Sequence, residues 1–427
     1  MKSSVKQNWY GSMVIITSWL AVFCLFGYRA TFALLKDPMS SQLGWSQAEI
    51  SLGYSLMMLF YAVTAFISGL LLDKWGTRPA YIVAAIFSFL GFFLTSYMSN
   101  FYLYLFTFGL LGGIATGMLW VTSTVSVRKW FIGKTYGTMW GLVFMGAPLS
   151  QLLLTNLTRI LMDYSGTEDW RLAMRYLSYL MLTAMLLAVL LAKRNPEDYG
   201  YKPVGYHEQS EEKTMTASFT LRKSYSYYAI WGVILTFLFS MMAEFLIWTQ
   251  IVSYWTGDLL LPRSQAIRTY SLIGLLGIFT MPIMGILADQ LVKKSKRESE
   301  GRKMMLTIGT VVGLLACLLL LYTGNSLWLI YFACLFFAIY WAVIPGGVIG
   351  YTGAIYGTRN LGKIWGLATL IVMGIGPFTG TFIGGLLKDI SGVYRYSIYF
   401  SLFSFLLAVI FSCTLPKRIE IKNLENL

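Results

Sequence analysis

Long apolar segments recur along the whole 427-residue chain, and they constrain its fold more than any other feature. About 20 apolar residues in a helix cross the hydrocarbon core of a bilayer. Hydrophobic residues make up 57% of the chain and charged residues only 12%, against about 25% charged in soluble domains. We therefore expect an all-α polytopic membrane protein. Its twelve spans are predicted at roughly 12–35, 48–72, 79–98, 102–127, 136–160, 174–192, 226–251, 266–291, 304–323, 327–350, 364–387 and 394–415.

The basic residues predict the orientation of these spans. With the N-terminus in the cytoplasm, 24 of the 33 Lys and Arg fall on the cytoplasmic side, eight fall on the outer side, and Arg29 lies within a span. This bias is the positive-inside pattern of an inner-membrane protein. The first apolar run is longer than a signal-peptide core, so we expect a retained helix and two cytoplasmic termini. The net charge of +14 then reflects topology, and no nucleic-acid partner is expected.

The sequence also contains an internal repeat. The segment that begins at Ile50 matches the segment that begins at Ala266, an offset of 216, and the segment that begins at Lys134 matches the one that begins at Arg359, an offset of 225. One loop accounts for the difference, because LVKKSKRESE stands in the second copy where the first has only Trp75. The chain is therefore a tandem duplication of a six-helix unit.

A polar stretch at 194–225 separates the two copies. We expect an N-terminal six-helix bundle at 1–193, a cytoplasmic linker at 194–225 and a C-terminal six-helix bundle at 226–427, related by pseudo-symmetry.

One loop motif gives this architecture a family resemblance. GLLLDKWGTR, from Gly69 to Arg78, resembles the motif between helices 2 and 3 of the major facilitator superfamily, and GILADQ followed by GRK resembles its second copy between helices 8 and 9. The chain resembles this superfamily over essentially its full length. The resemblance implies a secondary transporter that works by alternating access between two halves.

The motif residues predict a conformational latch. Asp73 and Asp289 are acids in a basic cytoplasmic belt, where each can meet the N-terminus of a neighbouring helix or an arginine across the half. A latch of this kind can form in one conformation and break in the other, and the alternative is a solvated loop that carries a topology charge. The candidate latch residues are Gly69, Asp73, Gly76, Arg78, Gly285 and Asp289.

Two charged residues lie well inside predicted spans, at nearly equivalent positions of the repeat: Arg29 in the first span and Glu244 in the seventh. A charge at mid-bilayer costs ~2.5–3.5 kcal/mol on insertion scales, so both are functional candidates. Arg29 presents a planar fork suited to a carboxylate or phosphate, and Glu244 can carry a coupling proton. The alternatives are that Arg29 extends outward toward the Lys36 end of its helix, or that the two charges form a static ion pair.

Polar aromatic residues surround these two positions in the predicted bundle. Trp120 and Trp341 belong to this set, and Tyr54 and Tyr270 are equivalent by the repeat, which makes them the best candidates to line a cavity. Interfacial belts or simple packing are the alternative role for such residues. The full candidate binding set is Arg29, Glu244, Tyr28, Tyr54, Tyr61, Trp248, Tyr270 and Tyr340.

Two organic-anion branches of the superfamily share features with this chain. GYRATFALLKDP resembles the helix 1 region of the organophosphate:phosphate antiporters, but those carry a second Arg on helix 7, where this chain has Glu244. The RKWF segment resembles the oxalate/formate and monocarboxylate transporters, but those carry a basic residue in helix 8, where this chain has FTMPIMGILAD. The resemblance to each branch is therefore loose.

Together these features predict a proton-coupled secondary transporter, acting as a monomer on a small organic anion or zwitterion, with a proton or a counter-substrate as its second ligand. The alternatives are a drug or amphiphile exporter, and a transporter-like sensor of substrate. No enzyme, metal or cofactor is expected, because the one histidine, His207, lies in the linker and the four cysteines show no CxxC spacing. FIGKT ends like a phosphate-binding loop but lacks its first glycine, so no ATPase is expected either.

Overall fold

The computed structural model describes residues 2–164, 169–205, 219–324 and 326–419. Within these ranges, twelve helical spans are long and apolar enough to cross a membrane, which confirms the predicted number and class. His207 and the middle of the predicted linker lie outside the described residues.

Ten of the spans are single helices, and two are built from consecutive helical segments. The fourth span joins α4 (Phe101–Tyr104), a π-helical segment η1 (Leu105–Leu111) and α5 (Gly112–Trp130), and the fifth joins α6 (Tyr136–Phe144) to α7 (Gly146–Tyr164). The single-helix spans are α1 (Lys2–Leu43), α2 (Gln47–Trp75), α3 (Thr77–Thr95), α8 (Trp170–Leu191), α11 (Tyr228–Gly257), α12 (Arg263–Lys294), α13 (Glu298–Tyr322), α14 (Leu327–Tyr356), α15 (Leu361–Ser391) and α16 (Arg395–Thr414).

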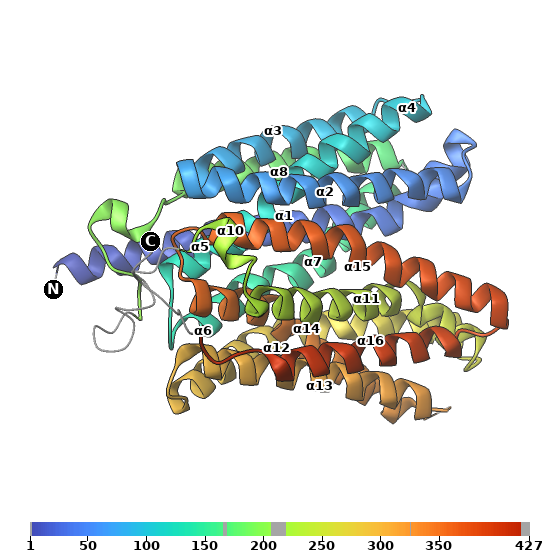
Figure 1. Ribbon diagram of the computed structural model, residues 1–427. Coiled ribbons are helices and arrows are strands. Elements are labelled where there is room, and N and C mark those ends of the chain that lie inside the picture. Colours follow the sequence, from blue (N-terminus) through green and yellow to red (C-terminus); the bar gives the residue numbers. More distant parts are fainter. Residues whose placement is uncertain (1, 165–168, 206–218, 325, 420–427) are drawn as a thin grey trace.

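The twelve described spans form two groups, six from the N-terminal part of the chain and six from the C-terminal part. The two groups lie against each other along the long axis of the molecule (Figure 1). α1 to α8 form the N-terminal half, and α11 to α16 form the C-terminal half. α1 begins and α16 ends at the same end of the molecule, which we call the termini face; the other end is the opposite face. An even number of spans requires this arrangement.

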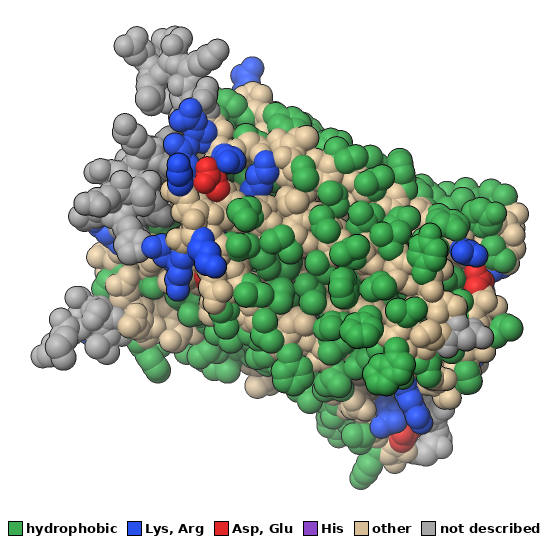
Figure 2. All heavy atoms as spheres, turned by 90° about the horizontal axis from the view of Figure 1, so that it is seen from below, with side chains coloured by type: hydrophobic (Ala, Val, Ile, Leu, Met, Phe, Trp, Pro, Cys, Tyr) green, Lys and Arg blue, Asp and Glu red, His purple; other side chains and the backbone are tan. Residues whose placement is uncertain are grey.

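The surface between these two ends is suited to lipid. Hydrophobic side chains cover the middle of the molecule, and Lys, Arg, Asp and Glu gather toward its two ends (Figure 2). Large apolar side chains such as Ile160, Phe279 and Leu190 are exposed along the spans. In water, molecules with such an apolar surface would aggregate. In a bilayer the same surface contacts lipid tails, and each helix satisfies its own backbone hydrogen-bonding groups.

Local sequence signals explain where several helices begin and end. Ser46 and Glu49 form a reciprocal capping box at the start of α2. Gly76 separates α2 from α3 with a φ of +83°, a conformation that glycine adopts without steric strain. α6 and α7 meet at Met145, just before Pro148 in the first turn of α7. The turn of the chain at Gly76 brings the motif residues to the termini face.

Candidate functional site

Arg29 lies on α1 with its guanidinium stacked over an aromatic ring. The guanidinium carbon is 4.3 Å from the centre of the Tyr61 ring and 5.7 Å from that of Phe26. Because Tyr61 lies near the middle of α2, the guanidinium lies deep between the two faces. Nε and Nη2 of Arg29 are buried and have no hydrogen-bond partner among the described residues. These two N–H groups share one edge of the guanidinium, the edge that binds a carboxylate through two parallel hydrogen bonds.

Glu244 lies on α11 with its side chain only 5% exposed. The hydroxyl of Tyr340, on α14, lies 2.9 Å from Oε2 of Glu244, and the indole N–H of Trp248 donates to Oε1 at 3.3 Å. Arg29 lies within electrostatic range of this carboxyl group. The described residues nevertheless include no ion pair or hydrogen bond between Arg29 and Glu244, so the two charges remain separate.

Aromatic rings connect the surroundings of the two charges across the boundary between the halves. Trp341, on α14, lies 5.3 Å from Trp248, 6.1 Å from Phe26 and 5.8 Å from Phe144, measured between ring centres. Trp120, on α5, packs edge-on against Phe26, and its indole N–H is buried without a partner among the described residues. The region between Arg29 and Glu244 is therefore bounded by apolar ring faces, with unsatisfied donors on the N-terminal side.

The repeat-related pair Tyr54 and Tyr270 lies on the two halves. Tyr54 stacks on Phe32 at 4.8 Å, and Tyr270 packs edge-on against Trp248 at 5.4 Å. Both tyrosines are half-buried. The structure thus places Tyr270 beside the partners of Glu244 and Tyr54 on the same half as Arg29.

Tyr28 is the predicted site residue that the structure places elsewhere. Its ring stacks on Phe92 at 4.0 Å, and its hydroxyl faces Gly91 and Gly112 inside the N-terminal half. Adjacent residues on a helix point in directions about 100° apart, and here Tyr28 points into the N-terminal half while Arg29 points toward Tyr61. Tyr28 therefore packs between α1, α3 and α5.

The first motif carboxylate, Asp73, joins the two halves at the termini face. Its oxygens accept hydrogen bonds from the backbone N–H groups of Gly362 at 3.2 Å and Lys363 at 2.8 Å, which form the N-terminus of α15. Lys129, from its own half, donates to it at 2.8 Å. Gly69 and Gly362 pack so closely that a Cβ on either would overlap the other's carbonyl oxygen. Asp73 thus contacts both kinds of partner: a helix N-terminus, which belongs to the facing half, and a cation, Lys129, which belongs to its own half.

The second carboxylate, Asp289, makes the equivalent contacts from the C-terminal half. The backbone N–H groups of Gly137 and Thr138 donate to it at 2.8 and 2.7 Å, as does the Thr138 hydroxyl at 2.7 Å. Arg302 pairs with it at 2.9 Å, and Gly285 packs against Gly137 as Gly69 does against Gly362.

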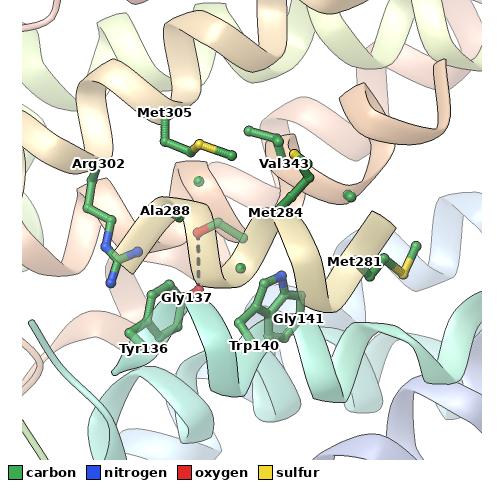
Figure 3. Close-up of a pocket in the computed structure, with 14 residues that line it drawn as sticks. Tyr136, Gly137, Trp140, Gly141, Met281, Met284, Ala288, Arg302, Met305 and Val343 are labelled. Carbon is green, nitrogen blue, oxygen red and sulfur yellow. Dashed lines mark hydrogen bonds between the residues drawn. The ribbon is translucent and has the colours of Figure 1, made fainter. Parts of the chain in front are cut away.

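A small pocket of about 20 Å³ adjoins this second contact, between α6 and helices α12, α13 and α14 (Figure 3). Trp140, Met281, Met284 and Met305 line it, so most of its wall is apolar. The Tyr136 hydroxyl closes one side by donating to the Gly346 carbonyl across the halves at 3.1 Å. The boundary between the halves is therefore closed at the termini face, apart from this small pocket.

Buried charges around these contacts were not among the predicted site residues. Arg128 pairs with Glu298 across the halves at 2.9 Å, and Arg302 donates to the Gly133 carbonyl at 2.7 Å. The ring of Tyr136 lies between the two guanidinium groups, 5.0 and 4.9 Å from their carbons. These residues lie in the RKWF segment that ends the fourth span and in the GRK of the second motif copy, which predicted family resemblances but no contact between the halves.

The other predicted latch residues have simpler surroundings. Gly76 packs against the side chain of Arg194, and Arg78 is exposed on α3. Neither contacts the C-terminal half in the described part of the chain.

The two described ends of the linker are attached to the segments that donate to the latch carboxylates. Val204 pairs with the backbone of Trp130 and Ile132, next to the Gly137 contact. On the C-terminal side, the Tyr225 hydroxyl donates to the Ile364 carbonyl at 3.0 Å, next to the Asp73 contact. At the termini face, the linker thus contacts the chain near both latch contacts, that of Asp73 and that of Asp289.

Comparison with known proteins gives one matching family model, described as the Major Facilitator Superfamily, over residues 18–372. The uncharacterized MFS-type transporter YcxA of Bacillus subtilis is 23% identical over 92% of this chain and 91% of its own length. Mouse monocarboxylate transporter 4 is 23% identical over 82% of this chain and 72% of its own. A fujikurins efflux protein of Gibberella fujikuroi is 24% identical over 42% of this chain, and the match spans only 38% of the relative.

Solved structures show the same fold at low sequence identity. The proton:xylose symporter XylE superposes with a TM-score of 0.71 at 14% identity, over 96% of this chain and 97% of its own. The human organic anion transporter MFSD10 superposes with a TM-score of 0.68 at 13% identity, over 95% of this chain and 99% of its own.

Proposed function

The chain belongs to the Major Facilitator Superfamily, which makes it a transmembrane transporter and not an enzyme, and from the geometry around Arg29 and Glu244 we propose what it carries. The proposed activity is secondary active transport of a small organic anion or zwitterion, a carboxylate-bearing metabolite. Transport is coupled to protons and proceeds by alternating access. The protein acts as a monomer in the inner membrane, with both termini in the cytoplasm.

The edge of Arg29 formed by Nε and Nη2 carries this proposal. A buried guanidinium edge without protein partners is costly unless an anion binds it, and a carboxylate matches both N–H groups at once. Stacking on Tyr61 fixes the plane of the guanidinium, so the carboxylate meets a preorganised partner. A sugar lacks the charge to use this edge fully, and a phosphate dianion carries two negative charges against the single positive charge of Arg29.

Glu244 is the proposed proton carrier. It lies within electrostatic range of Arg29, so an anion that offsets the charge of Arg29 favours a proton on Glu244. The converse also holds, because coupling between two binding events is reciprocal. In a zwitterion, the amino group would lie on the Glu244 side of the aromatic rings.

The contacts of Asp73 and Asp289 supply the alternating-access element. Both close the halves at the termini face, which the positive-inside distribution assigns to the cytoplasm. In this state the substrate would enter from the opposite, outer face. Opening toward the cytoplasm requires that both carboxylates leave the helix N-termini of the facing half.

Thermal-shift measurements on the purified protein test the substrate class. A panel of monocarboxylates, amino acids, sugars and phosphate esters is compared on the wild type, Arg29→Ala and the control Arg159→Ala, which removes an exposed arginine. We expect carboxylates to stabilise the wild type and the control but not Arg29→Ala. A ligand that stabilises all three proteins equally would show that Arg29 is not the anchor.

Uptake into proteoliposomes tests the coupling. We expect a pH gradient to drive substrate accumulation by the wild type. In Glu244→Gln the gradient should no longer drive accumulation, although the variant should still exchange internal for external substrate. Uptake that ignores the pH gradient, with Glu244→Gln fully active, would exclude proton coupling through Glu244.

Export of an amphiphile is the second candidate function. The ring-lined region around Trp341 favours it, and so does the partial match to an efflux protein. The two functions differ in their dependence on charge: an exported amphiphile would bind with little change in affinity in Arg29→Ala, whereas a carboxylate would not.

A further inference from the structure

The hydroxyl group of Tyr340 lies between two oxygen atoms of α11. It is 2.9 Å from Oε2 of Glu244 and 3.0 Å from the backbone carbonyl oxygen of Ser240. Both distances fit a hydrogen bond between oxygens. A tyrosine hydroxyl has one hydrogen, a carbonyl oxygen has none, and an ionised carboxylate has none. With Glu244 ionised, one of these two oxygen pairs would therefore be in contact without a hydrogen between them.

One proton on Glu244 removes this conflict. The protonated Oε2 donates to the oxygen of Tyr340, and Tyr340 then donates its own hydrogen to the Ser240 carbonyl. Oε1 still accepts from the indole of Trp248. Every group then has a partner, as expected for polar groups buried away from water. When Glu244 loses the proton, Tyr340 turns its hydrogen toward Oε2 and loses the Ser240 carbonyl.

The titratable and charged groups around this carboxyl and its partners Tyr340 and Trp248 come from four helices: Tyr340 of α14, Cys317 of α13, Tyr270 of α12 and Arg29 of α1. α15 and α16 meet this stretch of α11 with uncharged groups, since Gly380 faces Met242 and the Ser401 hydroxyl faces the Ala243 carbonyl. Arg29 is the fully charged member of the set, so its field is what an arriving anion changes.

The position of Tyr340 on α14 connects it to the contact between the halves. Pro345 follows it by little more than one turn and lacks the N–H that would bond back along the helix, so α14 is weakened at this point. The carbonyl of the next residue, Gly346, accepts the Tyr136 hydroxyl from the N-terminal half. Tyr340 and the contact between the halves at Gly346 thus lie on one short stretch of α14.

We propose that Tyr340 is a proton-dependent positioning residue, which holds α14 to α11 through the Ser240 carbonyl while Glu244 is protonated and releases it when the proton leaves. This rests on the proposed role of Glu244 as proton carrier and adds the residue through which the proton acts. In the state closed at the termini face, Glu244 is then protonated before any substrate binds.

Infrared spectroscopy of the ligand-free protein in nanodiscs at neutral pH tests this directly. We expect a carbonyl-stretch band from a protonated carboxyl group that disappears in Glu244→Gln. In Tyr340→Phe the carboxyl loses its acceptor, so the band should shift to higher frequency. Tyr254→Phe is the matched control, because it removes a different buried tyrosine hydroxyl, on α11, that donates to the Leu320 carbonyl at 2.9 Å. The band should not move in this control.

A missing band, or a band that Tyr340→Phe leaves unchanged, would overturn the assignment. If Tyr340→Phe does not fold, wild-type spectra decide the question: raising the pH until the Glu244 band vanishes must also change a tyrosine C–O band, and that change must be absent in Glu244→Gln. No ligand is present in these measurements. Their failure is therefore separate from failure of the carboxylate function, which the thermal-shift panel measures.

Discussion

Replacement of Asp289 by Asn should open the termini face. The carboxylate accepts three hydrogen bonds across the halves, from two backbone N–H groups and one hydroxyl, and it pairs with buried Arg302. An asparagine keeps one acceptor oxygen and turns an NH₂ group toward a backbone donor. It also leaves Arg302 without its carboxylate partner. Hydrogen bonds to charged groups contribute about 1.5–3 kcal/mol each, and they are not additive.

We therefore expect Asp289→Asn to weaken the closed state by about 2–4 kcal/mol, which corresponds to a change of roughly 30- to 1,000-fold in the closed-to-open ratio. Asp73→Asn should have a smaller effect, because Asp73 accepts two cross-half bonds, one of them at 3.2 Å. The matched control is Asp258→Asn. Asp258 also accepts two backbone N–H bonds, from Tyr394 and Arg395, but both lie in its own half on the opposite face.

Distances between spin labels measure this equilibrium. Labels at Arg78 and Lys296, which are exposed on the two halves at the termini face, are introduced in a Cys413→Ser background, because Cys413 is the exposed native cysteine. Asp289→Asn should shift the distance distribution to longer values. An unchanged distribution, or the same shift in Asp258→Asn, would refute the view that this carboxylate holds the halves together.

Three further changes give expected outcomes. Arg29→Lys keeps the charge but loses the fork, so carboxylate affinity measured by titration calorimetry should fall about tenfold or more, and full affinity would argue against bidentate binding. Gly69→Ala places a methyl group against a backbone carbonyl of the facing half, so it should lengthen the same spin-label distance, whereas Gly385→Ala, with open space around it, should not. Tyr225→Phe removes the linker's hydrogen bond to the Ile364 carbonyl, and we expect a loss of about 1 kcal/mol from the closed state. An unaltered distance distribution in Tyr225→Phe would mean that the linker end does not support the contact between the halves.

The sequence by itself determined the architecture of this protein. A bilayer requires every span to satisfy its own backbone groups, so twelve apolar runs could only be twelve helices. The matching offsets of the repeat gave two halves, and the motif copies placed Asp73 and Asp289 at equivalent loops. The energetic cost of a charge at mid-bilayer predicted functional roles for Arg29 and Glu244 from their positions in the spans alone.

Only the tertiary structure decided which groups meet. Tyr28 is adjacent to Arg29 in sequence, yet its ring packs inside the N-terminal half, because a helix turns neighbouring side chains away from each other. Tyr340 meets Glu244 from 96 residues away, and Arg128 meets Glu298 across the halves. Such pairs depend on the rotation and depth of each helix against its neighbours. Packing between helices sets this rotation and depth. The sequence of a single, uniformly apolar span does not indicate which of its faces packs against which neighbour.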